Sequence, residues 1–573
     1  MPDQQSHGNP LGVVHEVPED EIDALFANEV EEDGPGAAVG VYHRGSLLFT
    51  KGYGLADLES GQPITAQTPF HVASVSKQFT AFAVALLARE GRLDLDAAVR
   101  DYLPYVPKFN DVVTVRHLIL HTSGLRNQIM LVLLGGQGLE GRVTQQQVVN
   151  LVSRQQSLNF PPGTEYSYSN TGYILLAEIV FRITGQTLRE FTTDRIFAPL
   201  GMECTFFFDD VTEVVPYRAN SYARRRDEEG QEKAGWARAP LNFDNVGSSS
   251  LFTTVEDLGH WAGNLTDPLV GDKALIEQVC SSGTLNDGTA INYCFGLERG
   301  EMNGHTVLRH TGSDAAFRSV FVHFPAHDFA VAVLANTELG LMSKIESIAN
   351  LYLSDRAEPA TAVSAEDSRV DLSRFEGTYV PPHDISCRLE VHEETLMHHW
   401  GNRTPEKLTA RVDGTLDFGT ASGQSFFPVL GTAGEVTGLE VPRPGCGLPL
   451  YMERFTDPEV SPIYLGEYSG EFHSPELDIT YSVNAGNGEL FAHHLWSNHM
   501  LTLAAVVPDR FESPGDRLKF QLKMIFVFQR NDEGLITSLL IHTSGERNIH
   551  FDRVGDARAP APVASTPAQR TWN

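Results

Sequence analysis

The stretch HVASVSKQFTAFAVALLAREG (71–91) has the pattern of an amphipathic helix and carries a serine and a lysine near its start. Its apolar residues recur at helical spacing: Val75, Phe79, Phe82 and Leu86. This spacing predicts a helix, and Gly91 supplies the glycine at which such helices commonly end. At the start of the stretch, Ser74 and Lys77 are three residues apart, so a helix would place both side chains on one face.

A serine and a lysine at this spacing can form a nucleophile and its base. A serine hydroxyl is a weak nucleophile at neutral pH and needs a neighbouring group to take its proton. A lysine amine can be that group if desolvation or a nearby cation lowers its pKa. A serine that caps the helix next to a solvated lysine explains the same four residues, so Ser74 and Lys77 alone leave the function open.

Two further segments carry polar groups that suit a substrate cleft. In YSYSN (166–170), which follows a Pro/Gly loop, Tyr168 could relay a proton while the Asn170 amide binds a carbonyl. In HTGS (310–313), at the end of a short strand beginning near His305, glycine would let a ligand approach the backbone closely. An ordinary polar loop and a strand-ending turn with a surface histidine remain the alternatives.

Composition limits the classes of function. The chain has 573 residues, enough for three to four domains, and its 74 acidic against 43 basic residues give a net charge of -31 and a pI near 5.0. Such a chain repels phosphate backbones and anionic lipid, so we expect neither a nucleic-acid nor a membrane partner. We also expect a cytoplasmic location, because no signal peptide or long apolar run is visible.

The cysteines favour the same compartment. They are odd in number and scattered, and none forms a CxxC pair: Cys204, Cys280, Cys294, Cys387 and Cys446. This pattern is typical of reduced thiols rather than of a disulfide framework or a zinc site. No histidine pair is accompanied by further metal-ligating residues at a metal-site spacing, so we expect no metal and no cofactor.

The first 353 residues are predicted to form one α+β domain, with residues 1–16 as a loose tail. The expected helices are Pro18–Asp33, the 71–91 stretch, Thr114–Leu120, Gln145–Gln155 and Gly172–Thr184. The expected strands are a pair within residues 36–54 that turns at Arg44–Gly45, then Thr306–His310, Phe317–His323 and Phe329–Ala335. Helices enclosed by strands from both ends of a long segment indicate a single domain.

After a Pro/Ala/Ser/acid linker (354–370), two segments resemble each other: 371–457 and 462–556. Three landmarks recur in the same order and at nearly the same offset, namely Phe375–Tyr379 with Tyr468–Phe472, Gly434–Leu439 with Gly534–Leu539, and Arg454 with Arg553. Order and offset together indicate a duplication. Short alternating runs between Gly/Asn/Asp turns predict two small antiparallel β-barrels, followed by a disordered tail (557–573).

Together, the three motifs resemble the penicillin-recognising serine hydrolases, which include class C β-lactamases, D-alanyl-D-alanine carboxypeptidases, D-aminopeptidases and related esterases. The family signature is Ser-x-x-Lys, then Tyr-x-Asn, then Lys/His-Thr-Gly. It is matched here by Ser74 and Lys77, by Tyr168 and Asn170, and by His310, Thr311 and Gly312. Supporting likeness lies in LILHTSGL (118–125), PPGTEYSYSNTGYILLAEIV (161–180) and GSSSLFTTVEDLGHW (247–261), within roughly residues 20 to 350.

The resemblance implies a role for each matched residue. Ser74 would be the acylated nucleophile, while Lys77 and Tyr168 would share its proton and return one to the leaving group. Asn170 would bind the substrate carbonyl. The backbone N–H groups of Ser74 and Ser313 would form the oxyanion hole. The implied fold is a β-lactamase/penicillin-binding-protein-like α+β domain followed by two antiparallel, lipocalin-like β-barrels.

His310 departs from the common pattern, in which the third motif begins with lysine. A histidine is neutral much of the time at pH 7, so a fixed positive charge for a substrate carboxylate is missing. This disfavours the β-lactamase and carboxypeptidase branches. The resemblance to the D-aminopeptidases, which carry two trailing barrels, further implies that a barrel loop restricts the site. The candidate loops are VPDRFESPGDR (507–517) and VPRPGCGLP (441–449).

Three interpretations therefore stand. The first is a D-stereoselective aminopeptidase or amidase acting on small amides or short peptides. The second is a carboxylesterase or acyl-transferring relative, and the absence of GxSxG shows only that such an esterase would not be an α/β-hydrolase. The third is a binding protein with an inactive hydrolase domain. The oligomeric state stays open, with a homodimer as one candidate.

Overall fold

The computed structural model describes residues 19–137, 141–227, 231–353, 370–400, 405–411, 413–418, 425–443, 449–455, 464–494, 500–513, 523–543 and 545–556. The predicted tails and nearly all of the linker lie outside these ranges. The chain forms two compact units. The first contains most of the residues before 362, and the second contains the rest together with residues 126–139 and 154–159.

A six-stranded antiparallel sheet organises the first unit, in the order β10-β11-β12-β13-β1-β2. Its strands are β1 (Ala37–His43), β2 (Ser46–Tyr53), β10 (Glu298–Met302), β11 (His305–Asp314), β12 (Phe317–Phe324) and β13 (Phe329–Ala335). Strands from both ends of the segment therefore pair directly, Ala37 opposite Ala335, as the predicted single α+β domain requires. The smaller strands are β3 (Leu55–Asp57), β4 (Gln62–Pro63), β5 (Phe70–His71), β6 (Phe206–Phe207), β7 (Tyr222–Arg226), β8 (Glu232–Arg238) and β9 (Leu251–Thr253).

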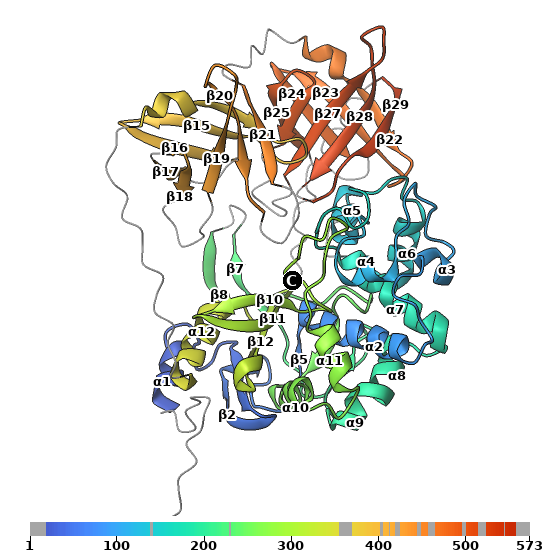
Figure 1. The fold of residues 1–573 in the computed structure, drawn as a ribbon, viewed down its shortest axis with the longest axis vertical. Coiled ribbons are helices and arrows are strands. Elements are labelled where there is room, and N and C mark those ends of the chain that lie inside the picture. The colour runs from blue at the N-terminus through green and yellow to red at the C-terminus, as the bar shows by residue number, and fades with distance from the viewer. Residues whose placement is uncertain are drawn as a thin grey trace, which may run out of the picture. The chain divides into compact units, whose positions relative to one another are not determined.

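Helices cover both faces of this sheet (Figure 1). The helices of the first unit, some of which pack on other helices, are α1 (Glu19–Phe26), α2 (Lys77–Arg89), α3 (Val99–Tyr102), α4 (Val115–Ile119), α6 (Gln145–Ser153), α7 (Asn170–Thr184), α8 (Leu188–Thr192), α9 (Ala198–Leu200), α10 (Val255–Thr266), α11 (Lys273–Val279) and α12 (Leu341–Tyr352). On one face, α1 and α12 pack onto apolar residues of β1, β12 and β13. On the other, α10 lies against β1, whose Tyr42 hydroxyl donates to the Val255 carbonyl. In the described ranges, no helix has the length and apolar character needed to cross a membrane.

Two predicted elements differ from those observed by more than a few residues. The helix expected over Pro18–Asp33 ends at Phe26, because the acidic residues that follow would lie at the negative end of the helix dipole. Lys344 binds there instead, donating to the Leu25 carbonyl at 2.7 Å and to Glu29 at 2.6 Å. The strand expected over Thr306–His310 continues to Asp314, since β12 pairs with it along its whole later half.

The second unit contains two closed eight-stranded antiparallel barrels (Figure 1). The first consists of β14 (Gly377–Val380), β15 (Cys387–His392), β16 (Thr395–Trp400), β17 (Glu406–Ala410), β18 (Leu416–Phe418), β19 (Ser425–Leu430), β20 (Val436–Val441) and β21 (Leu450–Phe455). The second consists of β22 (Gly470–Ser474), β23 (Ile479–Gly486), β24 (Glu489–His494), β25 (Met500–Val507), β26 (Arg510–Ser513), β27 (Met524–Arg530), β28 (Ile536–Thr543) and β29 (Ile549–Gly555). Neighbours in sequence pair in order, so both are up-and-down barrels.

The arginines that recur in the two barrel sequences occupy equivalent positions. Arg454 donates to the carbonyls of Glu376 and Val436, each at 2.9 Å. Arg553 donates to the matching carbonyls of Ser469, at 2.6 Å, and Ile536, at 3.2 Å. Each arginine lies on the last strand of its barrel, and its guanidinium ties the residue just before the first strand to the seventh strand. The duplication read from the sequence corresponds to a shared closing contact.

Residues 126–139 and 154–159 group with the second barrel, a division that the linear prediction did not anticipate. Arg126 is fully buried in this unit and lies 3.1 Å from the Glu476 carboxylate. Asn159 donates to the Glu546 carboxylate at 2.9 Å. Helix α5 (Gln128–Leu134) ends where its Leu134 carbonyl accepts a hydrogen bond from a tyrosine of the second barrel, at 3.0 Å.

We expect Arg553→Met to destabilise the second barrel by about 2 kcal/mol, because two backbone carbonyls lose a charged donor. Scanning calorimetry should show one transition lowered by several degrees. Arg388→Met is the matched control, since Arg388 is exposed and its ion-pair partner Glu390 is only partly buried, and it should change stability by less than about 0.5 kcal/mol. Equal transition temperatures for the two variants would show that Arg553 does not close the barrel.

Candidate active site

Ser74 lies at a change of helix type. It belongs to the 3₁₀ helix η1 (Ala73–Ser76), which runs directly into α2 at Lys77. The sequence predicts one continuous helix, but a 3₁₀ turn brings residues three apart into line even more directly. Ser74 and Lys77 therefore share a face as expected, and the Lys77 Nζ lies 3.0 Å from the Ser74 Oγ.

Backbone strain marks the residue before Ser74. Ala73 has a φ of 48°, in the left-handed region, which costs a residue with a Cβ roughly 1–2 kcal/mol. The residue preceding it, Val72, anchors this turn: its N–H donates to the Leu251 carbonyl at 2.9 Å, and its own carbonyl accepts from Ser319 Oγ at 2.7 Å. Strand β9 and strand β12 thus hold the serine where a free chain would not place it.

The Lys77 amine is fully buried and surrounded by oxygen atoms. Its Nζ donates to the Asn170 Oδ1 at 2.7 Å and to the Ser248 carbonyl at 2.6 Å, besides meeting Ser74. Burial lowers the pKa of Lys77 well below its usual value, although the Asp314 carboxylate opposes this shift. The amine is therefore driven toward its neutral form.

This hydrogen-bond set suits a neutral amine acting as a base. A neutral amine has two N–H groups, which the Asn170 and Ser248 oxygens use, and one lone pair. The lone pair then remains for the third neighbour, so the Ser74 hydroxyl donates its proton toward Lys77. The arrangement can remove the serine proton without any other group moving.

Tyr168 contributes a protonated phenol rather than a phenolate. The Lys77 Nζ lies 4.8 Å from the centre of the Tyr168 ring. Burial raises the pKa of Tyr168, the Glu298 carboxylate raises it further, and a hydrogen bond with Ser74 opposes both effects. At neutral pH this hydroxyl can therefore donate a proton but is not a strong base.

Asn170 begins helix α7 and points its amide at the same amine. Because its Oδ1 accepts from Lys77, its Nδ2 is left to donate, and no described residue accepts from that nitrogen. A substrate carbonyl is the natural partner for such a group. The structure thus brings Ser74, Lys77, Tyr168 and Asn170 together around one buried nitrogen.

His310 is buried and neutral. Its Nδ1 lies 2.7 Å from the Thr311 carbonyl, which can only accept, so this nitrogen carries the proton. Its Nε2 then accepts from the Tyr293 hydroxyl at 3.1 Å. Burial, together with the charge on Lys77 when that amine is protonated, lowers the pKa of His310 to about 3. The surface histidine that was the alternative interpretation is excluded.

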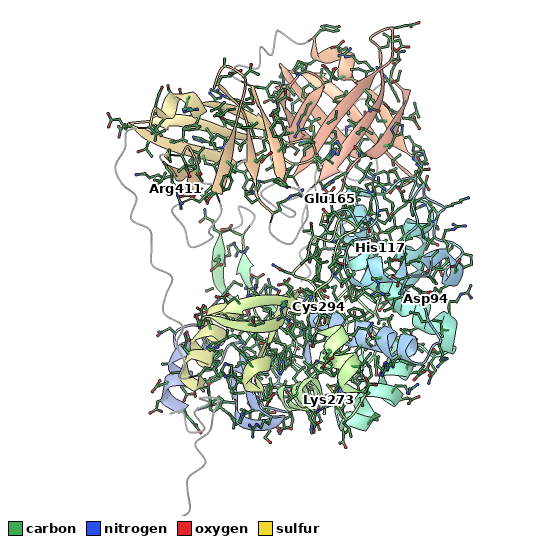
Figure 2. All side chains as sticks on the ribbon, in the orientation of Figure 1. Asp94, His117, Glu165, Lys273, Cys294 and Arg411 are labelled. Atoms are coloured by element: carbon green, nitrogen blue, oxygen red, sulfur yellow. The ribbon has the colours of Figure 1, made fainter. Side chains whose placement is uncertain are left out.

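Tyr293, which donates to His310, carries no motif that sequence inspection could have found. The next residue, Cys294 (labelled in Figure 2), is buried with Leu297 and Leu308, so the hydrophobic core sets the position of Tyr293. His121 was also missed as a site residue, although it lies in the family-like stretch 118–125. Its ring packs 4.3 Å from the Tyr168 ring, and burial keeps its pKa well below the usual value.

Strand β11 offers an open edge beside Ser74. Strand β10 pairs with β11 only from His305 to Arg309, and within the described residues the stretch 310–314 has β12 as its one strand neighbour. Extended peptides bind to such edges. Gly312 is required here, because a Cβ at this position would lie 2.2 Å from Ser319 Oγ and 2.3 Å from the Val72 carbonyl.

Other predicted features lie elsewhere or outside the described residues. Residues 514–517 and 444–448 of the two candidate loops are not described, so neither loop can be placed at the site. Among the residues that the structure describes, no three His, Cys, Asp or Glu side chains form a metal-binding cluster.

We expect Gly312→Ala to slow labelling of Ser74 by a fluorophosphonate about 100-fold, because the added methyl pushes β11 away from η1 by about 1 Å. Gly300→Ala on β10 is the control, since its Cβ would meet only Arg309 side-chain atoms at 3.8 Å or more. It should label at the normal rate. Normal labelling of Gly312→Ala would show that this close approach does not position the serine.

Comparison with known proteins agrees with this geometry. The β-lactamase family model matches residues 22–351, more than half of the chain. A D-aminopeptidase from Brucella anthropi is 27% identical over 533 residues, which is 91% of this chain and 96% of the relative. A D-aminopeptidase from Cereibacter sphaeroides is 26% identical over 543 residues, with the same coverage of 91% and 96%.

The fold is shared with a solved structure as well. An octameric penicillin-binding protein homologue from Pyrococcus abyssi superposes with a TM-score of 0.50 at 20% identity, covering 84% of this chain and 98% of that one. The family match and the arrangement of the motif residues lead to one conclusion. The chain belongs to the β-lactamase family and is a serine hydrolase.

Proposed function

We propose that this enzyme is a D-stereoselective aminopeptidase or amidase that hydrolyses small D-amino-acid amides or short peptides through an acyl-enzyme on Ser74. The observation that carries the proposal is the buried Lys77 amine 3.0 Å from the Ser74 Oγ, in a site where a buried histidine, His310, stands in place of a lysine. Two relatives that match nearly full length are D-aminopeptidases, which supports the same substrate class.

The first half-reaction follows from the contacts at Lys77. The neutral amine takes the Ser74 proton as the Oγ attacks the substrate carbonyl carbon. The backbone N–H groups of Ser74 and Ser313 are the proposed donors to the oxygen that becomes negative. Tyr168 gives its proton to the departing amine and regains one from the Lys77 ammonium, which leaves an ester at Ser74 and a neutral amine at Lys77.

The second half-reaction uses the same groups in reverse. Lys77, through Tyr168, takes a proton from water as its oxygen attacks the ester carbon. The tetrahedral intermediate collapses, the Ser74 oxygen leaves and recovers the proton, and the acid is released. Asn170 holds the substrate carbonyl through Nδ2 in both halves.

The charges around the site favour a substrate with a free ammonium. When Lys77, His121 and His310 are neutral, the Asp314 carboxylate is the charge that acts on Lys77, whereas Glu298 is paired with Arg309 at 3.6 Å. The Asp314 carboxylate attracts a positive α-ammonium and repels a carboxylate. The open edge of β11 can hold the backbone of a short peptide.

A carboxylesterase or acyl-transferring enzyme is the second candidate, because a neutral site also accepts neutral esters. An inactive binding protein fits less well, since the contact between Ser74 and Lys77 is intact. We also propose a reducing, cytoplasmic setting, supported by four described cysteines without disulfide partners: Cys204, Cys280, Cys294 and Cys387.

A substrate panel tests the proposal. We expect D-alanine p-nitroanilide to be hydrolysed with a kcat/KM at least tenfold higher than that of its L-isomer. The nucleophile and the edge strand have fixed positions, so only one enantiomer can present its carbonyl to Ser74 in the correct orientation. Ser74→Ala is the control and should lower kcat for both compounds by about 10⁶-fold. Faster turnover of p-nitrophenyl butyrate than of either anilide would instead favour the esterase.

The pH dependence tests the roles of Lys77 and His310. Because the pKa of Lys77 is lowered, the base is active above that pKa and is lost as pH falls through it. We expect kcat/KM to rise along a single acid limb and to show no step from His310 above about pH 5, since its pKa is about 3. His310→Asn should lower kcat but leave the limb in place. A limb displaced by a full pH unit would mean that His310 is charged in the working enzyme.

A further inference from the structure

The first barrel contains a cavity of about 350 Å³ at one end. The cavity lies at the end where β15, β17, β19 and β21 begin and β16, β18 and β20 finish. Among the described residues, those that line it belong to this barrel: Pro381, Asp384, Ile385, Cys387, His398, Trp400, Glu406, Phe418, Phe426, Val441, Arg443, Leu450 and Met452. An eight-stranded barrel is wide enough either to be filled by its own side chains or to hold one small ligand.

Comparison with the second barrel shows why this space is open. The strand registers align Cys387, which faces Tyr379, with Tyr481, which faces Phe472. They likewise align Met452, opposite Leu439, with Phe551, opposite Leu539. In the second barrel, the rings of Tyr481 and Phe551 therefore fill the space that the smaller side chains of Cys387 and Met452 leave open in the first barrel.

The same end of the second barrel is covered by the protein itself. The Tyr481 hydroxyl donates to the Leu134 carbonyl at the end of α5, at 3.0 Å. Arg126, just before α5, pairs with Glu476 in the loop between β22 and β23. The duplicated scaffold thus already uses this end to bind something other than its own strands. In the first barrel, Arg510 of β26 donates to the Pro381 and Asp384 carbonyls at the equivalent end, and a cavity remains beside them.

The lining defines the chemistry of an occupant. Aromatic and branched apolar groups form most of the wall, with Phe418 and Phe426 stacked edge to face at 4.9 Å. Asp384, Glu406 and Arg443 bring charges of both signs to the same cavity, so the lining favours neither an anion nor a cation and offers both donors and acceptors to an uncharged head group. The volume lies in the range of small-molecule pockets.

We propose that this end of the first barrel is a binding site for a small molecule with an aromatic or branched apolar body and a head group of no net charge that forms hydrogen bonds. None of its described lining residues belongs to the group around Ser74, and the proposal does not depend on the substrate proposed above. Apolar contact with the rings supplies the binding free energy, and the polar groups orient the head.

N-phenyl-1-naphthylamine is a suitable probe, because it is uncharged, aromatic and fluorescent in apolar surroundings. Titrated into the full chain, it should bind saturably at one site with a dissociation constant on the order of 10 µM or lower. Met452→Phe installs the residue of the second barrel and should weaken binding at least tenfold. Val554→Phe, at an exposed position of β29, is the matched control and should bind as the wild type does.

Further variants keep the result decisive. If Met452→Phe unfolds, Cys387→Met fills the same space from another strand and should weaken binding equally. Trp400→Phe should reduce energy transfer from tryptophan to the bound probe, because Trp400 lines the cavity. Absence of saturable binding to the wild type, or unchanged affinity in both filled variants while they remain folded, would overturn the proposal.

Discussion

The burial of one lysine amine is the constraint on which the site depends. Water would keep Lys77 charged, and a charged ammonium cannot take a proton from Ser74. Three separate parts of the fold exclude water and meet the amine with oxygen atoms: η1 through Ser74, α7 through Asn170, and the segment before β9 through Ser248. The strained turn at Ala73 and the close approach of β11 serve the same geometry, because each fixes the serine relative to this nitrogen.

The groups around the amine are polar but largely uncharged. Tyr168 remains a phenol, while His121 and His310 remain neutral because burial disfavours their charged forms. Hydrogen bonds from Tyr293 and to the Thr311 carbonyl fix which nitrogen of His310 is protonated. A fixed cation in the place of His310 would bind a substrate carboxylate and would also lower further the proton affinity of Lys77. The histidine therefore changes substrate preference and base strength together.

The two barrels show how one duplicated scaffold can diverge from the inside. Arg454 and Arg553 make the same closing contacts, so the strands and their order are preserved. The interior positions have changed, with Cys387 and Met452 in one barrel where Tyr481 and Phe551 stand in the other. Packing in the second barrel extends outward to α5, whereas the first keeps a cavity. Interior side-chain volume can vary in this way because closure depends on backbone pairing and on the arginines.

The sequence by itself determined the features that follow local patterns: the Ser74–Lys77 spacing, the paired strands of the sheet, and the repeated landmarks of the barrels. The departure at His310 was also visible, since it concerns a residue's identity within a motif. Only the tertiary structure decided that the Ser248 carbonyl, Tyr293 and His121 belong to the site. A backbone carbonyl has no residue type to recognise, and Tyr293 reaches His310 from a segment placed by the core. The grouping of residues 126–139 with a barrel more than 300 residues away likewise arises from long-range burial, which leaves no periodic signal in the chain.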